Sequence, residues 1–68
     1  MSESKPWFLY VVKCEDNTLY AGISPDVERR LSVHNSGRGA SYTASRRPVR
    51  LVAVWKFANQ SSALKAEI

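Results

Sequence analysis

Residues 7–23 read WFLYVVKCEDNTLYAGI and contain two strand-like runs separated by a short polar segment. The first run, Trp7–Lys13, is aromatic and β-branched and is apolar on both alternating faces, which is typical of a strand covered on both sides. Glu15-Asp16-Asn17 supplies turn residues, because Asp and Asn tolerate left-handed backbone. A second run, Thr18–Ile23, follows at hairpin distance, so the stretch predicts an antiparallel hairpin.

A helix is predicted directly after this hairpin. Ser24 can cap free backbone amides, Pro25 suits the first helical position, and Asp26 complements the positive end of a helix. The helix should run to about Asn35 and end at Gly37, because glycine is the usual residue just past a helix end.

The remaining chain predicts one more strand and one more helix. Residues 36–48 are rich in Gly, Ser and Arg and predict a loop, and Arg50–Ala58 alternates as a third strand. A last helix begins near Ser62, with Asn59 or Ser61 as its cap. The order strand, strand, helix, strand, helix predicts an α+β domain: a small three-stranded antiparallel sheet flanked by helices. The apolar positions expected on one side of the third strand are Leu51, Ala53, Trp55 and Phe57.

The size of the chain allows a single small domain of 68 residues. Its lone cysteine, Cys14, has no internal partner for a disulfide, which fits a reducing compartment. The sequence has no apolar run near ~18 residues and no secretory leader, so we expect a cytoplasmic protein without a membrane span. We expect residues 1–6 to be a disordered tail and residues 7–68 to form a monomeric domain. The last helix is short for its type, so we expect the domain to be incomplete at its C-terminal end.

Basic residues dominate the second half of the chain. After Glu28 the next acid is Glu67, and eight Lys or Arg residues lie between them. A surface with one sign of charge attracts polyanions, and the planar fork of arginine suits phosphate. A basic face that serves only solubility usually mixes both signs, so this run favours a nucleic-acid partner.

Candidate catalytic and binding residues are spread over the predicted strands and helices. Considered singly, each has an ordinary structural explanation: packing tyrosines, a strand glycine, a surface arginine, a solvent-facing histidine and an exposed helix acid. Their order along the chain is more informative than any one of them. The group comprises Tyr10, Tyr20, Gly22, Arg30, His34 and Glu67.

Four segments of the chain carry a family resemblance: Trp7–Tyr10, Leu19–Ile23, Asp26–Arg30 and Ser36–Ala40. In type and order they resemble the GIY-YIG nuclease superfamily, and within it the small stand-alone UPF0213 (YhbQ-like) proteins. Phe8-Leu9 stands where the family has Gly-Ile, and Ala21 stands where Ile is commoner. The resemblance covers about residues 7–68 and implies a GIY-YIG-like α+β nuclease domain.

The resemblance implies a role for each residue of the group. Tyr10 and Tyr20 match the motif tyrosines, which position or deprotonate the attacking water, and Gly22 matches the motif glycine. A free phenol has a pKa near ~10, so a base role requires a nearby cation. Arg30 matches an arginine that binds the scissile phosphate, and His34 matches a histidine that orients or relays a proton. These two residues lie one helical turn apart, so their spacing lets both face one phosphate.

Glu67 matches the acid that binds one divalent metal ion in the family. A single carboxylate with waters and phosphate suits Mg²⁺ or Mn²⁺, and such an ion stabilises the leaving oxygen. The implied activity is endonucleolytic hydrolysis of phosphodiester bonds in DNA, in structured or branched repair intermediates; these residues do not distinguish DNA from RNA. No protein partner is evident. Nucleic-acid contacts are expected from Arg29, Arg38, Tyr42, Arg46, Arg47 and Arg50.

Three functions compete for this sequence: a nuclease, a weakly active or inactive nucleic-acid-binding module of the same fold, and a structural or protein-binding domain. The tyrosines, Arg30 and Glu67 together favour the nuclease. The arginine-rich loop makes the third function least favoured. A Mg²⁺-dependent cleavage assay with variants at Arg30 and Glu67 separates the three.

Overall fold

A computed structural model describes residues 5–67 of the chain. Most of the expected tail, residues 1–4, and the last residue, Ile68, lie outside the described part. No helix within residues 5–67 has the length and apolar character needed to cross a membrane. The elements in chain order are β1 (Trp7–Lys13), β2 (Leu19–Ser24), α1 (Val27–Asn35), α2 (Ser41–Ala44), β3 (Arg50–Phe57) and α3 (Gln60–Glu67).

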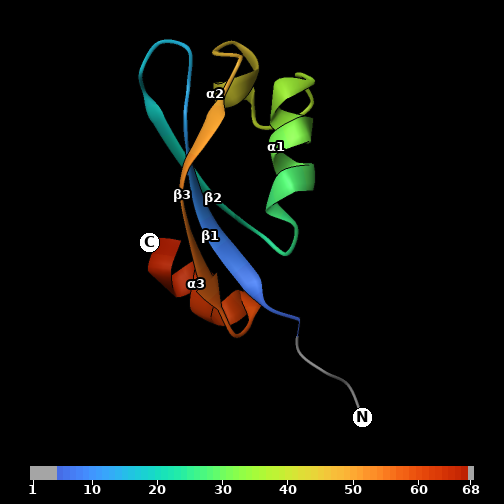
Figure 1. Cartoon of the computed structure of the whole chain (residues 1–68), viewed down its shortest axis with the longest axis vertical. Helices are drawn as coiled ribbons and strands as arrows, with labels where there is room; N and C mark the ends of the chain where they lie inside the picture. The colour runs from blue at the N-terminus through green and yellow to red at the C-terminus, as the bar shows by residue number, and fades with distance from the viewer. Residues whose placement is uncertain (1–4, 68) are drawn as a thin grey trace.

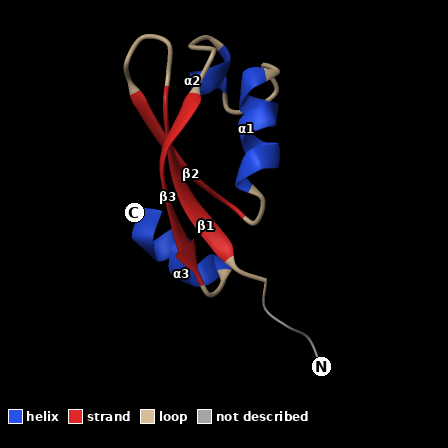
Figure 2. Ribbon diagram, in the orientation of Figure 1, coloured by secondary structure: helices blue, strands red, loops and turns tan. Residues whose placement is uncertain are grey.

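The strands form one antiparallel sheet in the order β2-β1-β3, which confirms the predicted hairpin and fold class. β1 is thus the central strand, with both of its edges hydrogen-bonded to neighbours. Tyr10 of β1 faces Gly22 of β2 on one side and Val54 of β3 on the other. Asn17 in the β1–β2 turn has φ 70°, the left-handed conformation that its residue type favours. The sheet is narrow and twisted, with α1 and α2 beside one end and α3 at the other (Figures 1 and 2).

Helix α1 begins two residues later than a cap at Ser24 would place it. The cap is Asp26, whose carboxylate accepts a hydrogen bond from the Arg29 amide at 3.1 Å. Ser24 instead forms hydrogen bonds with the backbone of Asp26 while still part of β2. The predicted end of the helix is confirmed, because Gly37 follows with φ 87°.

Two other boundaries differ from the sequence predictions. The predicted loop over residues 36–48 contains the short helix α2, in which Thr43 is buried and Tyr42 stacks on Tyr20. Helix α3 begins at Gln60, and of the two candidate caps it uses Asn59, whose side chain accepts from the Ser62 amide at 2.9 Å.

Strand β3 contains an irregularity that corrects the predicted alternation. Val11 pairs with Ala53 but Val12 pairs with Leu51, so Val52 is an extra residue on β3. Because paired residues share a face, Leu51 lies on the same side of the sheet as Val12, and Ala53 lies on the opposite side. The expected single apolar side is therefore split between the two faces.

The core of the domain is small and partly polar. Its apolar part consists of Tyr10, Val12, Cys14 and Val49, with Tyr20, Val27 and Leu31 packed against it. His34 and Thr43 are equally buried, at 2% and 0% exposure. Buried polar side chains need partners, and within the described residues every buried side-chain nitrogen or oxygen has one. The interior therefore holds a hydrogen-bonded polar group next to the sheet.

Candidate active site

Tyr10 forms the inner end of the candidate site. It lies on the central strand, is 3% exposed, and its hydroxyl forms a 2.9 Å hydrogen bond with Nε2 of His34 on α1. The side chain crosses β2 over Gly22, the residue that pairs with it. The motif glycine thus gives the tyrosine the space it needs to reach α1.

His34 points into the domain, which the sequence alone did not indicate. Its ring uses both nitrogens, one toward Tyr10 and the other, Nδ1, toward Oγ1 of Thr43 at 2.8 Å. Tyr20 of β2 packs edge-on against the same ring, with centroids 5.4 Å apart and an interplanar angle of 69°. The expectation that Arg30 and His34 face one phosphate together is wrong, because His34 is buried while Arg30 is exposed.

The surroundings of Tyr10 and His34 shift both groups toward their neutral forms. Burial raises the pKa of Tyr10 to about 12, with a further increase from Tyr20. The positive charge of Arg30 opposes this shift and the negative charge of Glu67 adds to it, so both charges act on the Tyr10 phenol. Burial, with a smaller effect from Arg30, lowers the pKa of His34 below its usual value. At neutral pH the hydrogen-bonded pair is therefore an uncharged phenol and an uncharged imidazole.

Arg30 and Arg29 stand beside the beginning of α1. With Ser24 and Asp26 they line a depression of about 310 Å³. The Arg30 side chain is exposed, yet its charge is felt by both Tyr10 and His34. Arg30 is therefore a solvent-exposed cation whose charge favours the ionised Tyr10 phenol and disfavours the protonated His34 imidazole.

Tyr42 extends the aromatic group outward from Tyr20. The two rings stack with centroids 5.8 Å apart and an interplanar angle of 24°. The Arg46 guanidinium lies 3.9 Å from the Tyr42 ring centroid, donates to the Tyr42 carbonyl at 2.8 Å, and pairs with Asp16 at 3.0 Å. Hydrogen bonds from Thr18, then Arg46, lower the pKa of Asp16. Arg46 thus ties α2 to the β1–β2 turn.

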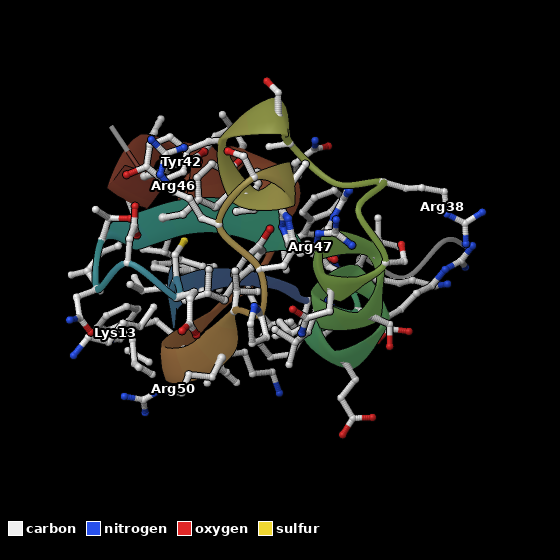
Figure 3. All side chains as sticks on the ribbon, turned by 90° about the horizontal axis from the view of Figure 1, so that it is seen from above. Lys13, Arg38, Tyr42, Arg46, Arg47 and Arg50 are labelled. Carbon is white, nitrogen blue, oxygen red and sulfur yellow. The ribbon has the colours of Figure 1, made fainter. Side chains whose placement is uncertain are left out.

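The other arginines expected to contact nucleic acid differ in whether their side chains are already hydrogen-bonded within the domain. Arg47 donates through Nε to the Ala44 carbonyl at 2.8 Å, whereas Arg50 is exposed and pairs directly across the sheet with Lys13. Two cations opposite each other on neighbouring strands repel, and an anion bound near both would reduce the repulsion. Viewed from above, Lys13 and Arg50 lie together, Tyr42 and Arg46 lie together, and Arg38 extends outward near α1 (Figure 3).

Glu67 is exposed in the last turn of α3, and its charge reaches the Tyr10 phenol. Within residues 5–67 no three His, Cys, Asp or Glu side chains gather into a metal-binding group. A lone exposed carboxylate fits an ion that keeps most of its waters and takes other ligands from a substrate, as Mg²⁺ does. It does not fit a zinc-type site closed by protein ligands.

Two residues of the site were not found from the sequence. Thr43 contacts His34 from α2, nine positions away, and no regular spacing connects the two residues. Gly39 packs against the His34 ring so closely that a Cβ atom would overlap Nδ1. Gly39 belongs to the segment that carried the family resemblance, but its contact could not be deduced without the fold.

The sheet order, the two motif tyrosines Tyr10 and Tyr20, and the helix arginine Arg30 together define a GIY-YIG-type domain. The GIY-YIG catalytic domain family matches residues 6–68, and the chain belongs to this family. Family membership indicates a nuclease in general, with a nucleic acid as substrate, and GIY-YIG nucleases generally use a divalent metal ion.

Within the family the chain is similar to UPF0213 proteins. It is 47% identical over 68 residues to a UPF0213 protein of Cupriavidus necator, covering all of this chain and 74% of that protein. It is 46% identical over 65 residues to the UPF0213 protein YazA of Bacillus subtilis, covering 96% of this chain and 66% of the relative. These similarities confirm the UPF0213 resemblance.

An NMR structure of a protein from E. faecalis has a similar fold. It superimposes with a TM-score of 0.60 at 46% sequence identity, covering 98% of this chain and 72% of that chain. The NMR structure of a UPF0213 protein from Bacillus halodurans gives a TM-score of 0.54 at 42% identity, over 91% of this chain and 66% of that one.

Proposed function

We propose that this chain is a divalent-metal-dependent endonuclease that hydrolyses phosphodiester bonds in DNA, acting on structured or branched repair intermediates. The observation that carries the proposal is the buried hydrogen bond between Tyr10 and His34, with the Tyr10 pKa affected by the charges of both Arg30 and Glu67. A phosphodiester cleavage site needs such a combination: a cation for the phosphate, a carboxylate for a metal ion, and polar groups that hold water.

Arg30 binds the scissile phosphate in this proposal. It is exposed and permanently charged, and its forked guanidinium can donate two hydrogen bonds to one phosphate. Charge that develops on the phosphoryl oxygens during the reaction strengthens these bonds, so Arg30 stabilises the transition state more than the bound substrate.

Tyr20 is the tyrosine that contacts the attacking water. It is half-buried, and within residues 5–67 none of the side-chain hydrogen bonds uses its hydroxyl, whereas Tyr10 is almost fully buried and bonded to His34. Tyr10, whose pKa is raised to about 12, is unsuited to act alone as a base at neutral pH. Tyr10 instead holds His34 by a hydrogen bond, and the His34 ring packs against Tyr20.

Glu67 would hold one Mg²⁺ or Mn²⁺ ion, with waters and substrate oxygens as the other ligands. Such an ion supplies Lewis-acid stabilisation of the leaving oxygen. Because Glu67 is exposed, its carboxylate is accessible to both ion and substrate.

Contacts to the nucleic-acid backbone come from the basic side chains around this site. Phosphate contacts supply affinity and orientation and little sequence choice. Arg46 is the least accessible of them, because Asp16 and Tyr42 already occupy its guanidinium. We expect the domain to act as a monomer in the cytoplasm. The proposed contacts are Arg29, Arg38, Tyr42, Arg46, Arg47 and Arg50.

Cleavage of flap, branched and single-stranded DNA, and of matched RNA, in Mg²⁺ or Mn²⁺ tests the proposal. We expect Arg30→Ala and Glu67→Gln to lower the rate about 100-fold or more, because each removes a preorganised charge. Glu15→Gln and Lys56→Gln, exposed charges away from the pair, serve as controls and should cleave like wild type. Equal background cleavage by wild type and both site variants contradicts the proposal.

The same experiment addresses the alternative of a binding module without catalysis. DNA affinity retained without cleavage supports the module. Loss of both affinity and cleavage supports a structural or protein-binding role.

A further inference from the structure

Three hydrogen bonds connect the sheet to helix α2 through the buried histidine. The Tyr10 hydroxyl is 2.9 Å from His34 Nε2, and His34 Nδ1 is 2.8 Å from Thr43 Oγ1. The Thr43 hydroxyl is in turn 3.0 Å from the Ala40 carbonyl oxygen. The series therefore has four members, and its last member can only accept a hydrogen bond.

The carbonyl at the end fixes the direction of all three bonds. The Thr43 hydroxyl has one proton, and only donation to Ala40 places a proton in that contact. Thr43 Oγ1 is then an acceptor, so the neutral imidazole carries its proton on Nδ1. Nε2 is left as the acceptor for Tyr10. The opposite direction leaves two oxygens 3.0 Å apart with no proton between them, in a part of the domain where Thr43 is 0% exposed.

We propose that Thr43 is a positioning residue that holds neutral His34 in the Nδ1–H tautomer and thereby makes Nε2 the acceptor for the Tyr10 hydroxyl. Isolated neutral histidine favours the other tautomer, so the protein must supply the preference. Its consequence for cleavage rests on the proposed nuclease function; the tautomer itself does not.

The position of Thr43 is fixed by the local fold. It lies in the first turn of α2, where its amide donates to the same Ala40 carbonyl at 3.1 Å. Gly39, just before α2, approaches the same Nδ1 edge of the His34 ring so closely that a Cβ atom there would overlap Nδ1. The imidazole is thus held by Thr43 at Nδ1 and by Tyr10 at Nε2, with the Gly39 backbone packed against its Nδ1 edge.

The tautomer of His34 determines whether the Tyr10 hydroxyl donates a hydrogen bond to the ring or accepts one from it. When the Tyr10 hydroxyl donates to His34, the remaining lone pairs of its oxygen are free to accept a hydrogen bond. With the other tautomer, Nε2–H would donate to Tyr10, and the Tyr10 proton would have to point elsewhere. Thr43 therefore leaves the Tyr10 oxygen free to accept a hydrogen bond and fixes the orientation of the His34 ring against which Tyr20 packs.

The tautomer can be measured directly, because the chain contains one histidine. Long-range ¹H–¹⁵N correlation spectra of the folded protein near pH 7.5 distinguish a protonated ring nitrogen from an unprotonated one by chemical shift. The coupling pattern distinguishes Nδ1 from Nε2. We expect Nδ1 protonated and Nε2 unprotonated. A wild-type spectrum with Nε2 protonated overturns the proposal without any variant.

Two substitutions at Thr43 assign the cause. Thr43→Val keeps the shape but offers Nδ1–H no acceptor, so the imidazole should change to the Nε2–H form. Thr43→Ser keeps the hydroxyl and should keep the wild-type spectrum. In Tyr10→Phe the Nδ1–H form should persist. A tautomer that changes in Tyr10→Phe but not in Thr43→Val assigns the control to Tyr10 and contradicts the proposal.

Cleavage measurements then test the consequence. In metal sites, outer partners that orient a ligating histidine are typically worth roughly 10- to 100-fold in activity, and we expect an effect of similar size at His34. We expect Thr43→Val to lower kcat by about 10-fold or more with little change in KM, and Thr43→Ser to restore it. A Thr43→Val variant with an altered tautomer and unchanged kcat contradicts the positioning role. If wild type cleaves nothing while the tautomers behave as expected, the nuclease function fails and the assignment of the tautomer to Thr43 stands.

Discussion

Tyr10 and Gly22 face each other across β1 and β2, and a Cβ atom at position 22 would lie 2.5 Å from the Tyr10 hydroxyl oxygen. The same Cβ would lie 2.7 Å from Cζ of the ring. These contacts are too short for any real side chain. The glycine therefore keeps open the path by which Tyr10 reaches His34.

Gly22→Ala should destabilise the domain and displace Tyr10. Overpacking of this kind costs about 1–3 kcal/mol in the free energy of unfolding. Thermal or urea unfolding measures the loss, and cleavage should fall beyond it because the Tyr10–His34 bond is broken. Ala21→Ser, at the exposed neighbouring position, is the control and should unfold like wild type. Unchanged stability in Gly22→Ala would show that the ring moves aside freely.

The hairpin and the sheet could be predicted because their signals are local. Residues 7–13 are aromatic and β-branched, polar turn residues follow, and Asn17 adopts the conformation that its type favours. The helix ending before Gly37 was visible for the same reason. The short helix α2 was not, because its segment is dominated by residues typical of loops and its contacts, Thr43 with His34 and Tyr42 with Tyr20, are with distant elements.

The polar interior could not be predicted, because it depends on contacts between elements. Histidine four residues after an arginine indicates only a shared helix face, and that pattern made His34 a surface residue. What buries it is Tyr10 from the sheet and Thr43 from α2, which provide a partner for each ring nitrogen. Without both partners a buried imidazole would be costly.

The burial of His34 predicts a specific pH dependence of stability. Its pKa is lowered in the folded state, so between that value and the unfolded value near ~6.5 the unfolded chain binds more protons. The contribution is therefore fully present above about pH 6.5 and is lost as pH falls toward the folded pKa. The melting temperature of wild type should decline over this range before most carboxylates titrate.

His34→Gln is the matched variant for this prediction. It should melt lower than wild type at neutral pH but show a flatter dependence on pH below about 6.5, because the titrating group is gone. Parallel declines in the two proteins would mean that His34 is not the group responsible.

Tyr10 predicts a change at the opposite end of the pH range. Its pKa is raised to about 12, so its contribution to stability is full below the unfolded value near ~10 and is lost as pH rises toward 12. Tyrosinate absorbance should show a step near pH 12 that disappears in Tyr10→Phe and remains in Tyr42→Phe. A step near pH 12 that survives in Tyr10→Phe would assign it to another tyrosine.

The basic residues show that charge in a sequence does not indicate accessibility. Arg46 and Arg50 look equivalent in the sequence, but Arg46 is held by Asp16 and by the Tyr42 ring and carbonyl. Arg50 is exposed opposite Lys13. Distance in sequence conceals this difference, since Asp16 lies thirty residues before Arg46.

Salt dependence of DNA binding separates the two arginines. Removing one arginine that binds a phosphate should reduce the slope of log K against log salt by roughly 1. We expect Arg50→Gln to reduce the slope by about 1 with an unchanged melting temperature, because its side chain is exposed. Arg46→Gln should mainly lower the melting temperature, since it releases α2 from the β1–β2 turn. Fluorescence anisotropy at several salt concentrations gives the slopes. A flat response in wild type, or an equal reduction of the slope with unchanged stability in both variants, would contradict this division of roles.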